Sequence, residues 1–488
     1  MDPHAVNAAS VTSFLNNIYE GLVRRNAEME IEPSLSTRWE PLTDEEGWRF
    51  FLRRGVRFHG GEVFTADDVL FSYERAISET SDVTSWFAPV EEVRVVDEYT
   101  IDFITTNPNP LFPDSIANFM VMSREWAEAN GAEEPASRQE NYATRNANGT
   151  GPFVLAARSP GVETRLTPNS RWWDTVEHNL TEAIYTPIEN QSTALSALLS
   201  GEIDMISPVP LQDVRRVEAQ RGFKVLSGLE TRVIMLGFGH EKSSLDYSDD
   251  LRGENPFQDP RVRRAVYQAI DVATINRVVM RNAAEPASQL IPAGLSGYSE
   301  EHAERYPYDP DAARRLLRQA GYPNGFSFGL MCPNDRYLND EQVCRAVTSM
   351  LADVGLEAEL NTMPVRNYWG ELREDNYDMY LLGWSPGTFD HEHPIRFLLH
   401  TPDAEARLGS WNYGGYSNDR IDQLLPRIQS ELDPEARQEM IDEIVEIYQE
   451  EVAYVPLYTQ PLIWALKQNI DLVQRPDNFF MLRWVTVN

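Results

Sequence analysis

A short apolar strand that runs into a glycine, a tryptophan and a loop decides the expected fold: Leu381-Leu382-Gly383-Trp384-Ser385-Pro386-Gly387-Thr388-Phe389-Asp390. Domains built from alternating strands and helices place their ligand crevices at the carboxyl ends of the strands. A tryptophan at such an end predicts an aromatic ring beside a crevice. With the segments below, this stretch predicts a two-lobed protein that encloses a small solute.

The surrounding sequence is typical of an α/β fold. Strands and helices alternate over residues 320–385, which predicts a sheet covered by helices. Earlier, residues 92–96 and 99–104 predict a hairpin. Aspartate caps free amides and proline suits the first helical position, so three Asp-Pro pairs predict helix starts. These pairs are Asp259-Pro260, Asp309-Pro310 and Asp433-Pro434.

Length and charge restrict the class of protein. A chain of 488 residues is too long for one ordinary core, so two or three domains are expected. Its longest apolar run is too short for a membrane span. Acidic residues outnumber basic ones, 76 to 43, which gives a net charge of −33. Such a charge repels nucleic acid and anionic membranes, so neither is an expected partner.

Two cysteines, Cys332 and Cys344, lie twelve residues apart. A disulfide forms if the compartment is oxidising, and a free buried pair is the alternative. The sequence leaves both open. Without a local histidine cluster, two cysteines do not make a zinc site.

Several short motifs are spread over nearly the whole chain. Besides the Gly383-Trp384 turn, they are Asn17-Ile18-Tyr19-Glu20-Gly21-Leu22, residues 53–61, Phe64-Thr65-Ala66-Asp67-Asp68-Val69, Gly149-Thr150-Gly151-Pro152-Phe153, residues 259–265, Tyr308-Asp309-Pro310 and Val455-Pro456-Leu457-Tyr458. In type and order, these motifs resemble those of the peptide/nickel-type (family 5, dipeptide/oligopeptide-like) solute-binding proteins of bacterial ABC importers.

The resemblance implies a bilobal periplasmic-binding-protein-like fold, type II and extended class, with two β/α lobes joined by a hinge. Lobe I would comprise residues 1–250 and 450–488, with an inserted subdomain at about 25–148, and lobe II residues 251–449. The polar stretch 239–258 is interpreted as the first crossing between them. Lobe closure on the solute is expected to precede delivery to ABC permease subunits.

The same resemblance implies a monomer in the periplasm, or one lipid-anchored outside the cytoplasmic membrane. No leader precedes Met1-Asp2-Pro3-His4 in this numbering. Relatives usually carry a further strand before the matching segment, so we expect that the mature protein begins upstream of Met1.

Aromatic side chains are the first candidates for ligand contact, because a closed cleft gains affinity from stacking and apolar contact. We select Trp384, Phe389, Trp411 and Tyr413. The last two lie in a glycine-containing segment that suits a loop close to a ligand. The alternative is that these rings fill the core of lobe II.

Arg336, just before a predicted helix, is the candidate for gripping a carboxylate through two parallel hydrogen bonds. It matches the position at which dipeptide-binding relatives hold the carboxyl terminus of a peptide. The alternative is a surface arginine paired with Asp335 or Asp340.

One departure from the family pattern concerns the ligand's amino group. Peptide-binding relatives usually place an aspartate at the slot occupied here by Gly387. Asp390 or Glu392 is a possible substitute, because an ammonium group in a closed cleft needs a paired charge. A short peptide remains the main prediction, and an oligosaccharide, a carboxylated compound or a metal chelate remains an alternative.

The sequence gives less support to a catalytic or metal-binding function than to solute binding. Asp390-His391-Glu392-His393 has metal-binding residue types, but a short acidic loop is usually solvent-exposed. No zinc-protease, nucleophile-elbow or phosphate-binding motif is present, so no catalytic residue, metal or cofactor is expected. The competing hypothesis is a secreted hydrolase that uses Asp390 or Glu392 as acid/base.

Overall fold

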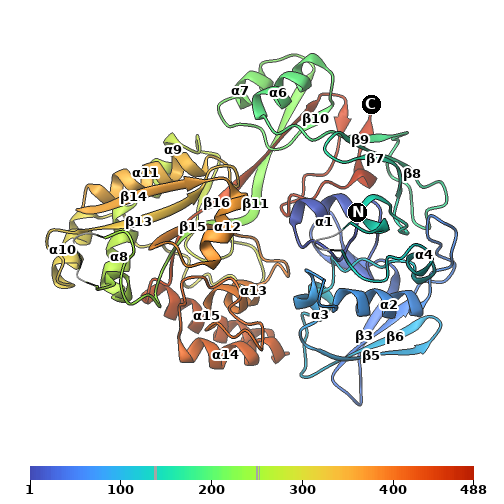
Figure 1. Cartoon of the computed structure of the whole chain (residues 1–488), viewed down its shortest axis with the longest axis horizontal. Helices are drawn as coiled ribbons and strands as arrows, with labels where there is room; N and C mark the ends of the chain where they lie inside the picture. The colour runs from blue at the N-terminus through green and yellow to red at the C-terminus, as the bar shows by residue number, and fades with distance from the viewer. Residues whose placement is uncertain (137–139, 249–250, 252) are drawn as a thin grey trace. The chain divides into compact units, whose positions relative to one another are not determined.

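The computed structural model describes residues 1–136, 140–248, 251 and 253–488, which form two compact units (Figure 1). Unit 1 comprises Met1–Leu226 and Trp464–Asn488, and unit 2 comprises Ser227–Ile463. The chain passes from one unit to the other within two long strands, β11 (Phe223–Phe238) and β16 (Tyr454–Lys467).

These crossings differ from the boundaries expected at 250/251 and 449/450. The polar stretch 239–258 follows β11 instead of carrying the crossing, and its residues 249, 250 and 252 lie outside the described residues. The polar residues of this stretch indicated an irregular connection between the lobes, whereas the chain passes between the units within the hydrogen-bonded strands β11 and β16.

Two apolar cores lie among the described residues of unit 1. One lies within residues 22–121 and includes Phe50, Phe103 and Phe119, all fully buried. It is covered by a four-stranded antiparallel sheet in the order β3-β4-β6-β5, which places a separate core within the predicted subdomain at about 25–148. The sheet strands are β3 (Ser36–Pro41), β4 (Gly47–Leu52), β5 (Val90–Asp97) and β6 (Thr100–Thr105).

The predicted hairpin is formed by β5 and β6. The second core of unit 1 joins the chain's start to its end, because Leu15 and Ile18 pack with Leu482 and Val485. The remaining elements of this unit are α1 (Ala9–Leu15), β1 (Val23–Arg25), β2 (Ile31–Pro33), α2 (Ala66–Ala76), α3 (Phe112–Ser115), α4 (Arg124–Ala129), α5 (Tyr142–Arg145), β7 (Phe153–Ser159), β8 (Glu163–Pro168), β9 (Ala183–Tyr185), α6 (Gln191–Ser200), β10 (Met205–Ile206), α7 (Val214–Glu218), β17 (Ile470–Asp471) and β18 (Thr486–Val487).

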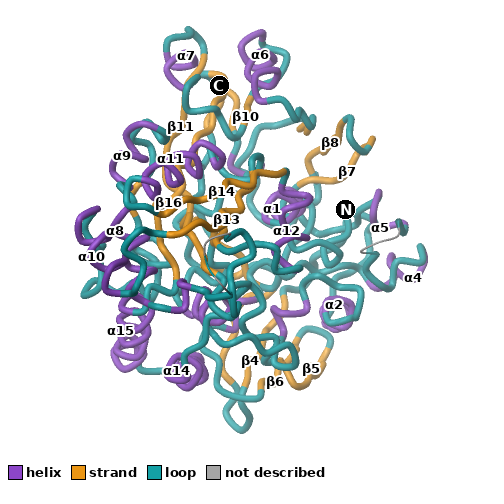
Figure 2. The backbone as a smooth tube through the Cα atoms, turned by 60° about the vertical axis from the view of Figure 1, so that its left-hand side comes forward, coloured by secondary structure: helices purple, strands orange, loops and turns teal. Residues whose placement is uncertain are grey.

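Unit 2 is a sheet with helices against it, as the alternating pattern predicted (Figure 2). The strand order is β16-β11-β15-β13-β14; β13 runs parallel to both of its neighbours and β11 runs antiparallel to β15. Its further elements are α8 (Pro260–Ala269), α9 (Val272–Val278), β12 (Glu285–Pro286), α10 (Pro310–Gln319), β13 (Phe326–Pro333), α11 (Asp340–Ala352), β14 (Leu356–Met363), α12 (Val365–Arg373), β15 (Met379–Trp384), α13 (Glu392–Pro394), α14 (Asp419–Ser430) and α15 (Pro434–Glu450).

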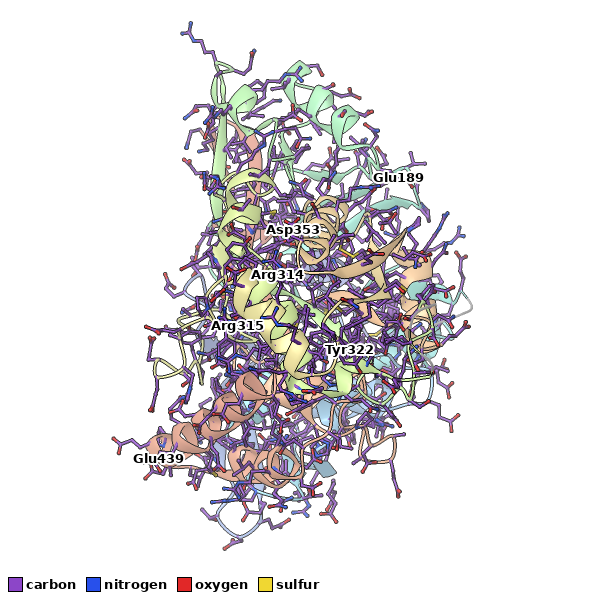
Figure 3. All side chains as sticks on the ribbon, turned by 90° about the vertical axis from the view of Figure 1, so that its left-hand side faces the viewer. Glu189, Arg314, Arg315, Tyr322, Asp353 and Glu439 are labelled. Carbon is purple, nitrogen blue, oxygen red and sulfur yellow. A yellow bond between two sulfur atoms is a disulfide. The ribbon has the colours of Figure 1, made fainter. Side chains whose placement is uncertain are left out.

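All three predicted Asp-Pro helix starts are confirmed in unit 2. Asp259 accepts a hydrogen bond from the Arg261 amide at 2.8 Å at the start of α8. Aspartates 309 and 433 cap α10 and α15 in the same way, each followed by proline in the first turn. The α10 helix is tied to the end of α11 by Arg314, which donates to the carbonyl oxygen of Asp353 at 2.6 Å (Figure 3). No helix in the described part of the chain is long and apolar enough to span a membrane.

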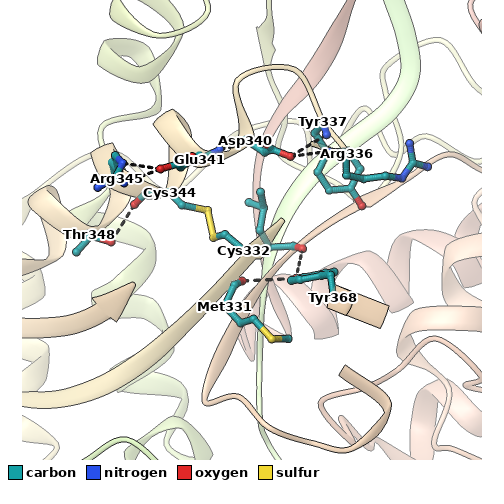
Figure 4. The surroundings of a disulfide bond; sticks show 11 residues. Met331, Cys332, Arg336, Tyr337, Asp340, Glu341, Cys344, Arg345, Thr348 and Tyr368 are labelled. Atoms are coloured by element: carbon teal, nitrogen blue, oxygen red, sulfur yellow. Dashed lines mark hydrogen bonds and ion pairs between the residues drawn. A yellow bond between two sulfur atoms is a disulfide. The ribbon is translucent and has the colours of Figure 1, made fainter. Parts of the chain in front are cut away.

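The two cysteines form a disulfide between β13 and α11 (Figure 4). Cys332 lies on the strand and Cys344 on the helix, and both are fully buried. The bond therefore fixes α11 to the strand whose end leads into the loop that contains Arg336.

We expect the Cys332→Ala/Cys344→Ala double variant to be less stable by about 2–3 kcal/mol, because the cross-link closes a short loop and so constrains the unfolded chain. Urea unfolding of the variant and the oxidised parent measures the difference. The reduced parent should match the variant. Equal midpoints for all three samples would show that the bond adds no stability.

Candidate functional site

The carboxyl ends of β13 and β15 lie at one edge of the unit 2 sheet, because these strands are parallel neighbours. The loop after β13 carries Arg336 and Tyr337, and β15 ends at Trp384. The amide of Gly383 donates to the Tyr337 hydroxyl at 2.9 Å and so joins the two strand ends. A Cβ on residue 383 would lie 2.6 Å from the Tyr337 ring, so only glycine permits this contact.

Arg336 is exposed, and its guanidinium forms no ion pair within the described part of the chain. The two carboxylates that could have paired with it are occupied elsewhere. Asp340 accepts the backbone amides of Arg336 and Tyr337, each at 2.9 Å, and Asp335 accepts the Val365 amide at 2.6 Å. Figure 4 shows the Arg336 guanidinium turned away from Asp340.

Neighbouring atoms partly desolvate the Arg336 guanidinium, and this desolvation, followed by repulsion from Arg232, lowers its pKa. Two like charges therefore lie near each other at this edge of the sheet. The charge of Arg232 is already offset by Glu230, whereas a carboxylate placed beside Arg336 would relieve the repulsion on that guanidinium.

Arg232 and its neighbours on β11 were not selected from the sequence. Residue 233 is opposite Trp384 in the antiparallel pairing, so residues 230–232 continue past the end of β15. The Thr231 hydroxyl lies 2.8 Å from that of Ser385, and Arg232 pairs with Glu230 at 3.0 Å. The signal that could have revealed them is the Glu-Thr-Arg triplet directly before the apolar run 233–236. Charged residues are seldom fully buried unless they are paired, so two opposite charges at the start of an apolar strand indicate a paired, functional position.

Trp384 lies mostly in the core of unit 2, with 8% of its surface exposed. Its ring centroid is 5.6 Å from those of Trp411 and Phe397. Its indole Nε1 is buried and has no hydrogen-bond partner among the described residues. Trp411 and Tyr413 are half-buried at the border of the same cluster. The predicted rings other than Phe389 thus form one aromatic group, which is both core and surface.

The loop after Trp384 holds the remaining candidates. Gly387 is exposed, and a Cβ there would lie 3.1 Å from Nε2 of His393. Phe389 is half-buried and has a positive φ of 59°, with its backbone held by Pro386 and Ser296.

Asp390 and Glu392, the predicted substitutes for the missing aspartate, are engaged within unit 2. Asp390 is 1% exposed and receives both terminal nitrogens of Arg437, at 2.9 and 2.7 Å. Glu392 is buried and accepts from Gln429 at 2.6 Å. These contacts favour a structural role for both carboxylates and leave them poorly placed as an ammonium anchor, an acid/base pair or metal ligands.

The comparisons with known proteins settle the family. The model of the bacterial extracellular solute-binding proteins, family 5, matches residues 30–406. The chain belongs to this family. The glutathione-binding protein GsiB of Escherichia coli (strain K12) is 23% identical over 482 residues, which cover 96% of this chain and 88% of GsiB.

Solved structures show the same fold. DppA from Helicobacter pylori, in complex with the peptide STSA, superposes with a TM-score of 0.83 at 24% identity, over 100% of this chain and 95% of DppA. AgaA from A. tumefaciens R10, in complex with agropinic acid, gives 0.82 at 22% identity, over 99% and 95% of the two chains. The predicted bilobal α/β fold of the periplasmic-binding-protein type is thereby confirmed.

Proposed function

We propose that this family 5 protein captures a small carboxylated solute outside the cytoplasm and passes it, chemically unchanged, to the permease subunits of an ABC importer. Arg336 and Arg232 would face the solute's carboxylate, and Trp384, Trp411 and Tyr413 would line its apolar part. The observation that carries this proposal is the Arg336 guanidinium, which has no carboxylate partner in the described part of the chain and is repelled by a second arginine, Arg232.

Relatives support a binding role. Their names and complexes refer to glutathione, a peptide and agropinic acid, so proteins of this fold hold chemically different solutes. The engaged state of Asp390 and Glu392 supports the same conclusion, because a hydrolase working here would need a carboxylate free to exchange a proton.

Native mass spectrometry of freshly purified protein, followed by calorimetry with short peptides, glutathione and other carboxylated compounds, tests the proposal. Stoichiometric binding without any product is the expected result. Product formation would establish a hydrolase, and selective binding of uncharged sugars would contradict the carboxylate requirement.

The glycine at position 387 leads to a prediction about the amino end of the ligand. Because no aspartate stands at this slot, acetylating the amino group of a bound peptide should change its dissociation constant less than about threefold, well under the tenfold that 1.4 kcal/mol represents. Calorimetry with each peptide and its acetylated form measures this ratio. A methyl ester at the carboxyl end is the matched control and should bind far more weakly. A large loss on acetylation would show that another group anchors the ammonium.

A further inference from the structure

Unit 1 contains a small pocket whose wall carries four arginines. Arg24 and Arg25 come from β1, and Arg475 and Arg483 come from the C-terminal segment. Glu20 is the acidic residue of the lining, and its carboxylate already accepts hydrogen bonds from Trp172, Trp173 and Thr150. All of these residues belong to unit 1, whereas Arg336 and Arg232 belong to unit 2.

Arg483 is the least satisfied of the four arginines. It is 6% exposed, and among the described residues its guanidinium makes one hydrogen bond, from Nη2 to the carbonyl oxygen of Arg25 at 3.3 Å. Its Nε is buried and has no partner among the described residues. Burial, followed by the like charges of Arg24 and Arg475, lowers its pKa to about 10. A guanidinium so placed is costly unless an anion accompanies it.

Arg263 in unit 2 shows what a structural buried arginine looks like in this protein. It is 4% exposed, and its three nitrogens donate to the carbonyl oxygens of Phe257, Gln258, Glu451 and Val452. A purely structural role thus goes with a nearly full set of acceptors. Arg483 is buried to a similar extent but lacks such a set of hydrogen-bond acceptors among the described residues.

Apart from Glu20, carboxylates near the pocket pair with the other three arginines. Arg24 bonds to Glu32 and Asp174, both at 2.7 Å, yet its Nη1 remains buried without a partner among the described residues. Arg475 forms an ion pair with Asp477. The hydroxyl of Ser34, which also lines the pocket, is buried and lacks a partner in the same described set.

We propose that this pocket is a binding site for a small anion, held by Nε of Arg483, Nη1 of Arg24 and the hydroxyl of Ser34. The ligand class is a chloride-like ion or a single compact oxyanion such as phosphate or acetate. Three hydrogen-bond donors that have no acceptor among the described residues converge on one pocket, and they come from β1, from the residue directly after β2 and from the C-terminal segment. The bound anion would therefore join the start of the chain to its end and stabilise unit 1.

Thermal unfolding in sodium chloride, sodium phosphate, sodium acetate and sodium gluconate, at equal ionic strength, tests the proposal. Gluconate is too bulky for the pocket and serves as the reference. At least one compact anion should raise the Tm of the parent by about 2–4 °C above gluconate, in a saturable manner. Comparing the Tm in the different salts also identifies which anion the site prefers.

The Arg483→Gln variant should lose this specific increment, whereas Arg94→Gln should keep it. Arg94 is an exposed arginine of unit 1 that pairs with Glu45 and Glu92, so it controls for the loss of one positive charge. Equal increments in the parent and in Arg483→Gln would overturn the proposal.

If Arg483→Gln does not fold, crystals of the parent soaked in sodium bromide decide the question. An anomalous scattering peak within hydrogen-bond distance of Arg483 supports the site. An empty pocket, together with no specific Tm increment in the parent, overturns it.

Discussion

Replacing Arg336 by alanine is expected to weaken the binding of a carboxylated solute by about 2–4 kcal/mol, because the partner carboxylate would be left unpaired in a desolvated site. The side chain has no carboxylate partner among the described residues, so its removal breaks no internal ion pair and should leave the stability of unit 2 nearly unchanged. Calorimetry measures the loss, and urea unfolding confirms the intact fold.

Arg345→Ala is the matched control for Arg336→Ala. Arg345 lies on α11 in the same unit and pairs with Glu341 at the surface, and this variant should bind like the parent. Arg336→Lys should fall between the parent and Arg336→Ala, because an ammonium keeps the charge but cannot form two parallel hydrogen bonds. Equal affinity in the parent and in Arg336→Ala would remove Arg336 from the site.

Local signals in the sequence predicted local structure well. Each Asp-Pro pair marks a helix start because the chemistry of capping involves only neighbouring residues. The strand that ends at Trp384 was predictable for the same reason, since an apolar run, a glycine and a loop are contiguous in the chain.

Features that depend on residues distant in the sequence were harder to predict. Arg437 is 47 residues from Asp390, so nothing near the acidic loop showed that its carboxylate was already paired. Arg232 reaches the site because β11 is opposite β15, a pairing over about 150 residues that hydrophobic patterning alone does not specify. Whether the two cysteines form a disulfide could not be predicted for a similar reason, because their spacing in the sequence does not reveal whether the two sulfur atoms meet.

Removing the guanidinium from Asp390 is expected to be the most destabilising single change at the site. In Arg437→Met, the carboxylate of Asp390 stays buried without its bidentate partner, and the free energy of unfolding should fall by about 3–5 kcal/mol. Urea unfolding measures this loss through the shift of the midpoint at constant slope. The Asp390→Asn/Arg437→Met double variant should recover most of it, because no uncompensated charge remains.

Arg420→Met is the matched control for this prediction, since Arg420 on α14 pairs with Glu443 on α15 where both side chains are exposed, and surface pairs contribute only about 0–1 kcal/mol. If Arg437→Met costs no more than Arg420→Met, the ion pair is not what holds Asp390 in place. The same variants decide between structure and function for Asp390. A carboxylate that serves only the fold leaves solute affinity intact in the Asp390→Asn/Arg437→Met protein, whereas a loss as large as that of Arg336→Ala would place Asp390 in the binding site, as the family pattern first suggested.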